Sequence, residues 1–156
     1  MKTLLALGVA LGLPSLSALG IPQTIQSPVL VVGTNLTFEQ LATDPGSWGA
    51  TSSLKGNWKT QGDTLTLGDP VAVFGIAADE ITARQQDGQV QSFRVVFRPK
   101  EKSTGNLLSR VAANVRAFTG NAGTKAGDTT VFKYKGVTIT LRSGAAHEVV
   151  AEFTRA

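Results

Sequence analysis

The spacing of apolar residues changes along this chain, and that change most constrains its fold. Alternating apolar and polar residues, typical of a strand with one buried face, run from Val90 to Arg98. Apolar residues then recur every three or four positions, as in an amphipathic helix, at Leu107, Leu108, Val111, Val115 and Phe118. Ser103 or Thr104 can cap the start of this helix, and Gly120 stands where it should stop. We therefore expect one long helix between two groups of strands.

The strands after the helix are joined by a short turn. Lys135-Gly136 separates two alternating runs, and a two-residue turn at this point pairs Tyr134 with Val137. That register places the apolar residues of both runs on one face of the sheet. A third run, from His147 to Phe153, continues the same face. The pattern predicts three consecutive antiparallel strands.

The strands before the helix surround the sequence Gln86-Asp87-Gly88. A two-residue Asp-Gly turn would place Ile81 opposite Arg94, whereas a three-residue loop with a left-handed glycine pairs Ile81 with Phe93. We favour the three-residue loop, because a register slip of one residue would move every apolar side chain to the opposite face.

The N-terminal third of the chain carries weaker signals. Val29–Val32 is a β-branched run that fits a short strand. Thr37 and Gln40 have the spacing of a capping box, which predicts a short helix to about Ala42. Residues 46–63 are rich in Gly, Ser and Thr, and we expect a loop or irregular short strands there. The whole pattern predicts an α+β fold, in which an antiparallel sheet of about five to six strands packs one long helix on one face, plus a short N-terminal helix.

The first 20 residues have the layout of a secretory signal peptide. Lys2 precedes a ten-residue apolar run, Leu4–Leu13, and small residues lead to Gly20. Cleavage near Gly20 would leave residues 21–156 as a single domain that is periplasmic or secreted. No later apolar run could cross a hydrocarbon core about 30 Å thick, so no transmembrane anchor is expected after cleavage. The chain has no Cys, which removes thiol catalysis and favours a bacterial envelope over a disulfide-built secreted module.

No coherent catalytic set appears in the sequence. His147 is the only imidazole, and no G-x-S-x-G motif accompanies it. Ser52 and Lys55 have the S-x-x-K spacing but lie outside any helical pattern. The glycine-rich residues 120–127 follow the end of the expected helix, where the dipole has the wrong sign for a phosphate, so we expect a linker. The 11 acidic residues are scattered, so we assign no catalytic residue, metal or cofactor.

Charge divides the chain into two unlike halves. Residues 21–97 carry 4 Lys or Arg and 7 Asp or Glu, whereas residues 98–156 carry 10 and 4. The basic half predicts a surface that attracts an anionic polymer. Its candidate binding residues are Lys133, Lys135 and Arg142. A second candidate surface is the tryptophan-bearing segment, with Trp48, Lys55, Trp58 and Lys59.

Three hypotheses for the function follow from these observations. The first is an exported, non-enzymatic domain that binds an anionic envelope polymer or another envelope protein. No nucleic acid is expected, because the aromatic residues of the basic half follow core periodicity. The second is a hydrolase assembled around His147, which needs a carboxylate or hydroxyl within hydrogen-bond reach of the imidazole. The third is a structural subunit that pairs with another chain through a long, unprotected sheet edge.

Overall fold

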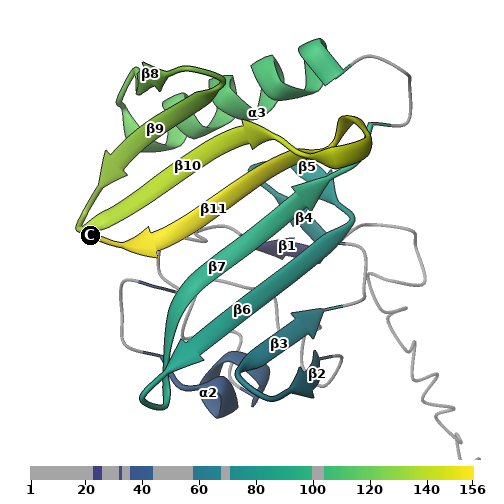
Figure 1. The fold of residues 1–156 in the computed structure, drawn as a ribbon, viewed down its shortest axis with the longest axis vertical. Coiled ribbons are helices and arrows are strands. Elements are labelled where there is room, and N and C mark those ends of the chain that lie inside the picture. Colours follow the sequence, from purple (N-terminus) through teal and green to yellow (C-terminus); the bar gives the residue numbers. More distant parts are fainter. Residues whose placement is uncertain (1–22, 26–31, 33–35, 44–57, 68–70, 100–103) are drawn as a thin grey trace, which may run out of the picture.

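The structure is a computed structural model that describes residues 23–25, 32, 36–43, 58–67, 71–99 and 104–156, arranged as in Figure 1. Helix α2 spans Phe38–Thr43, helix α3 spans Thr104–Thr119, and a 3-10 turn, η3, spans Ala145–His147. The strands are β1 (Gln23–Ile25), β2 (Trp58–Gln61), β3 (Thr64–Leu67), β4 (Val71–Val73), β5 (Ile76–Ala78), β6 (Glu80–Gln86), β7 (Gln89–Phe97), β8 (Thr124–Ala126), β9 (Thr129–Tyr134), β10 (Val137–Ser143) and β11 (Val149–Arg155).

An eight-stranded antiparallel sheet forms the centre of the described structure, in the order β2-β3-β6-β7-β11-β10-β9-β8. Helix α3 packs on one face of it, against β9, β10 and β11 (Figure 1). A smaller sheet of β1, β4 and β5 lies on the same side. The predicted α+β class is confirmed. The sheet has eight strands instead of five to six, because β3 was not predicted, β8 forms where a loop was expected at 121–128, and β2 forms within 46–63, where a loop or irregular short strands were expected.

The two faces of the large sheet differ in chemistry. The inner face, on which α3 packs, carries the hydrophobic core, and the largest core side chains are at most 2% exposed. They are Phe93, Phe97, Phe132, Phe153, Leu65, Leu67, Ile81 and Ile139. The outer face is the one turned to the viewer in Figure 1, where α3 lies behind the sheet. Because side chains alternate along a strand, each buried inner residue has outward-facing neighbours.

The hairpin of β6 and β7 differs from the expected one. Asp87 and Gly88 form a two-residue turn with φ of 54° and 76°. A β-bulge beside this turn adds one residue to β7 and places Ile81 opposite Val95. The expected three-residue loop is therefore wrong, and so is the pairing of Ile81 with Phe93. The shared apolar face of the two strands is confirmed, because the bulge restores the alternation that a two-residue turn alone would invert.

The C-terminal strands keep the expected register, with one exception at the start of β11. Tyr134 pairs with Val137 across the β9–β10 turn, as predicted. Strand β11 begins at Val149, whereas His147 lies in η3. The expected strand start at His147 is therefore wrong. The chain turns at this point through two residues of positive φ, Ala146 at 51° and His147 at 65°, which no strand accommodates.

Both predicted helices are present. The Thr37 N–H donates to Gln40 Oε1 at 3.0 Å and the Gln40 N–H donates to Thr37 Oγ1 at 3.1 Å, which is a reciprocal capping box. Helix α3 stops at Gly120, whose φ is 66° and whose N–H donates to a carbonyl of the last helical turn at 2.8 Å. Of the strand expected at Val29–Val32, only Val32 lies within the described residues, and it is buried and helical.

The tip of the β4–β5 hairpin packs between α3 and the inner face of the large sheet. Phe74, at the tip of the hairpin, has a φ of 52°, which is uncommon for an aromatic residue. Its ring centre lies 5.3 Å from that of Phe118 on α3 and 6.0 Å from that of Phe153 on β11. Asn114 Nδ2 donates to the Phe74 carbonyl at 2.7 Å. Asn114 on α3 therefore anchors the hairpin.

Candidate binding surface

The outer face of the large sheet presents a regular polar surface. Strand alternation places Thr on it more often than any other residue, together with Ser, Gln, charged residues and the apolar Val96, Val131, Val150 and Ala126, and no aromatic residue lies among the outward positions of the described strands. The outward-facing threonines are Thr64, Thr66, Thr82, Thr124, Thr129, Thr138, Thr140 and Thr154. Apart from Val96 and Val150, which are buried, the outward-facing residues are partly or fully exposed.

A set of outward residues lies side by side across the sheet from β2 to β9. The strand register pairs each with the next, in the order Gln61, Thr64, Arg84, Ser92, Thr154, Thr138 and Lys133. We call this set the polar row. It holds hydroxyl groups, an amide and two cations, and it holds no carboxylate. Because neighbouring strands are about 4.8 Å apart, its six steps span about 29 Å.

Carboxylates occur in the two rows beyond the polar row. The adjacent row runs through Thr82, Arg94, Glu152 and Thr140. The next row begins at Glu80, on the start of β6. The polar row itself therefore holds no negative charge, and the acidic residues at its end of the sheet are Asp63 and Asp87, which are exposed in the β2–β3 and β6–β7 turns.

Several cations of the outer face are exposed and have no ion pair within the part of the chain that the structure describes. They are Lys59 on β2, Arg84 on β6, Lys133 on β9 and Arg142 on β10. No described side-chain hydrogen bond engages them either. Exposed cations without an internal partner raise the local concentration of anionic groups near the surface.

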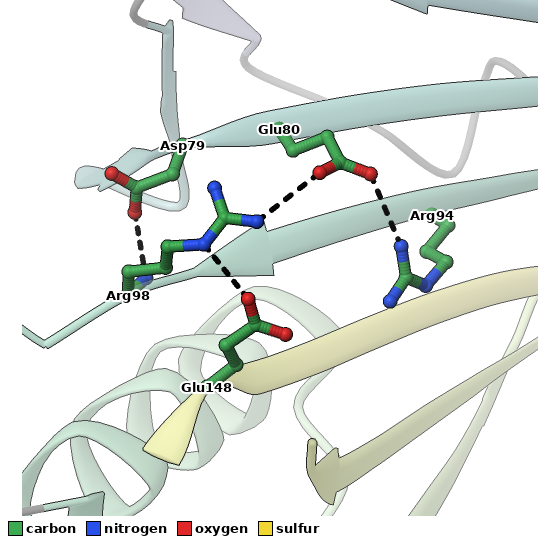
Figure 2. Close-up of polar contacts among 5 residues, drawn as sticks. All are labelled: Asp79, Glu80, Arg94, Arg98 and Glu148. Carbon is green, nitrogen blue, oxygen red and sulfur yellow. Dashed lines mark hydrogen bonds and ion pairs between the residues drawn. The ribbon is translucent and has the colours of Figure 1, made fainter. Parts of the chain in front are cut away.

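Charges at the other end of the outer face neutralise one another, as Figure 2 shows. Arg98 Nε donates to Glu148 Oε1 at 2.7 Å, and its Nη2 lies 3.2 Å from Glu80 Oε2. Arg94 Nη1 lies 3.4 Å from Glu80 Oε1, and Asp79 Oδ2 accepts the backbone N–H of Arg98 at 2.6 Å. The hydrogen bonds to Glu148 and then Glu80 raise the pKa of Arg98 above its usual value. We call these five residues the ionic cluster.

The ionic cluster lies around two apolar residues that face outward. Val96 and Val150 pair across β7 and β11 and are each 1% exposed. On β6, Glu80 lies opposite Val96. Arg94 lies two residues before Val96 on β7, and Arg98 lies two residues after it, just beyond the end of the strand. Internal ion pairs thus occupy the β6–β7 side of this end of the outer face, whereas Arg84 and Lys133 of the polar row, and Arg142 beside Val150, have no ion pair in the described structure.

The basic candidates predicted from the sequence fall at separate places. Lys133 belongs to the polar row, and Arg142 lies four residues along the neighbouring strand. Lys59 is on the same face but on the edge strand β2, several strands away. Lys135 lies in the β9–β10 turn, with its Nζ 5.2 Å from the ring centre of Tyr134. The structure therefore gathers three of them on one face, without bringing any two into contact.

The tryptophan-bearing segment is only partly described. Trp58 pairs with Leu67 on the inner face and packs, partly buried, against the hydrophobic core. In that position Trp58 covers one end of the core. Lys59, its neighbour, points to the outer face instead. Trp48 and Lys55 lie outside the described residues.

Arg84 and the threonines were not among the sequence-based candidates. Arg84 belongs to the acidic half of the chain, so the division by net charge concealed it. The strand at Thr64–Leu67 was not predicted, so neither were its outward threonines. Thr64 lies beside Arg84 because of the strand order and the register. The residue pattern within one strand contains neither.

His147 does not form a catalytic arrangement within the described structure. Its side chain is exposed, and no hydrogen bond or ion pair joins it to another described residue. The described residues also hold no group of three or more His, Asp or Glu that could bind a metal. The geometry that a His147-centred hydrolase needs is therefore not found in this part of the chain.

Both edges of the large sheet are short. Strand β2 has four residues and β8 has three, and each contains a lysine, Lys59 and Lys125. Short edge strands that carry Lys discourage pairing with another chain. Among the described strands, the edges of this sheet therefore lack the long unprotected strand that an edge-pairing subunit requires.

Comparison with known proteins gives no relative from which a function could be inferred. No family model matches the chain, and no curated protein or solved structure does so either. Within the described ranges, neither helix has the length and apolar character needed to span a membrane.

Proposed function

We propose that this protein is an exported, non-enzymatic domain that binds an anionic polysaccharide on the outer face of its large sheet. The observation that carries the proposal is the set of exposed outer-face cations without an ion pair in the described structure: Lys59, Arg84, Lys133 and Arg142. The export part rests on the layout of the first 20 residues. An exported protein of this kind meets glycans of the envelope or the cell exterior.

The chemistry of the outer face favours a sugar polymer among the anionic partners. Its threonine hydroxyls both donate and accept hydrogen bonds, as sugar hydroxyls do. A long chain can also contact several cations at once, which matters because one exposed ion pair contributes at most about 1 kcal/mol. The outward positions of the described strands hold no aromatic side chain on which the bases of single-stranded nucleic acid could stack.

Retention on immobilised heparin, a sulfated polysaccharide, tests the proposal. We expect the purified protein to bind at low ionic strength and to elute as salt screens the outer-face cations. The double variant Arg84→Gln/Arg142→Gln should elute at clearly lower salt than the wild type. Absence of retention at low salt, or tighter binding to single-stranded DNA than to heparin, would refute the proposal.

A charge-matched control distinguishes binding at the outer face from an effect of net charge alone. Arg110 and Arg116 are exposed on α3, behind the sheet, and have no described ion pair. The double variant Arg110→Gln/Arg116→Gln removes the same charge from the helix side and should elute close to the wild type. Equal losses in the two double variants would show that only net charge matters, and would contradict a site on the outer face.

A further inference from the structure

We infer that the polysaccharide crosses the strands along the polar row, with its anionic groups held by Arg84 and Lys133. This inference rests on the proposed function and adds the path of the ligand, its anchoring residues and its minimum length. The register already places the members of the row side by side from β6 to β9, through Ser92, Thr154 and Thr138.

Carboxylates determine which path an anionic chain can take. A chain laid along β6 from Arg84 would reach Glu80, and a chain laid along β11 from Thr154 would reach Glu152. A path along β10 from Thr138 to Arg142 passes Thr140, which pairs directly with Glu152. Glu152 repels an anionic chain on the β11 and β10 paths, and Glu80 is already paired with Arg94 and Arg98, which leaves the β6 path without a free cation beyond Arg84. The members of the polar row on the same strands include no carboxylate, although Glu152 lies two residues from Thr154 on β11.

The two anchors set the length of the ligand. Arg84 on β6 and Lys133 on β9 are separated by four inter-strand steps, which is about 19 Å. Between them, partly exposed hydroxyls of Ser92, Thr154 and Thr138 can exchange hydrogen bonds with sugar hydroxyls. A ligand therefore needs anionic groups about 19 Å apart to engage both anchors, and a shorter oligosaccharide engages only one.

A pair of charge-matched variants on the same face tests the path. Arg84→Gln/Lys133→Gln removes one Arg and one Lys from the polar row, and Lys59→Gln/Arg142→Gln removes one of each from positions off the row. Affinity for fluorescently labelled heparin would be measured by anisotropy at low salt. We expect the first variant to bind about tenfold more weakly than the wild type, and the second, which removes outer-face cations that lie off the path, to lose about two- to threefold.

The outcomes test the path of the ligand separately from the proposed function. Equal losses in the two variants, or a larger loss in the off-row variant, would overturn the path while heparin binding itself still stands. Failure of the wild type to bind heparin would remove both. All four positions are exposed, and unchanged circular dichroism spectra would show that the variants remain folded.

Graded heparin oligosaccharides test the anchor separation independently. Wild-type affinity should rise when the oligosaccharide becomes long enough to join Arg84 to Lys133, because the second contact is then intramolecular. The single variant Arg84→Gln should lose this rise and bind long and short oligosaccharides alike. A rise of the same size in Arg84→Gln would show that Arg84 is no anchor.

Discussion

The two faces of the large sheet are built from the same strands but are subject to different constraints. On β7, Phe93 is fully buried on the inner face, whereas its neighbours Ser92 and Arg94 are partly exposed on the outer face. The inner residue is fixed by packing against the core. The outer residues lie on the solvated side, so packing against the main core does not fix their identity. The comparison teaches that core packing constrains one side of a strand and leaves the other side free to carry the binding proposed above.

The largest expected effect is the contrast between adjacent residues of β11. Phe153→Ala removes a fully buried ring from the inner face, and we expect the free energy of unfolding to fall by about 3–5 kcal/mol. Thr154→Ala changes the next residue, on the outer face, and should change it by less than about 0.5 kcal/mol. Urea unfolding followed by circular dichroism measures both. A Thr154→Ala cost similar to that of Phe153→Ala would mean that the outer face is itself a packing surface.

Much of the inner face could be predicted from the sequence, because burial leaves a periodic pattern. The spacing of apolar residues gave α3 its bounds within a residue, and the two-residue turn fixed the pairing of Tyr134 with Val137. The β6–β7 register was wrong because a bulge changes the residue count within a strand, and a bulge leaves the apolar alternation nearly intact. The edge strand β8 was missed because an exposed strand has no apolar pattern to detect, β2 falls where a loop or irregular short strands were expected, and β3 was not predicted.

The candidate site was harder to predict than the fold. Lys133 was found through the charge of the C-terminal half, and Arg84 was missed because it lies in the acidic half. Their alignment depends on the order of strands that are distant in sequence, and no local pattern records that order. The ionic cluster was missed for the same reason, since Arg98 and Glu148 are 50 residues apart.

A smaller effect is expected where β8 meets the inner face. A Cβ at Gly123 would lie 2.8 Å from the ring of Phe132, which is 1% exposed, and the φ of Gly123 is 73°. Gly127 has a φ of 61° but no atom within 4 Å of a Cβ, so Gly127→Ala measures the backbone strain alone. We expect Gly123→Ala to be less stable than Gly127→Ala by about 1–3 kcal/mol in urea unfolding. Equal stabilities would show that the edge strand yields to the added methyl group.

The smallest expected effect concerns the charged residues of the outer face. Arg98 forms ion pairs with Glu80 and Glu148, but its side chain is 47% exposed, so solvent screens them. We expect Arg98→Gln to lower the free energy of unfolding by at most about 1 kcal/mol, and the loss to shrink in high salt. Arg84→Gln should leave stability unchanged, because Arg84 has no ion pair within the described residues. If Arg84→Gln instead destabilised the protein as much as Arg98→Gln, Arg84 would be engaged within the fold and could not be an anchor for a ligand.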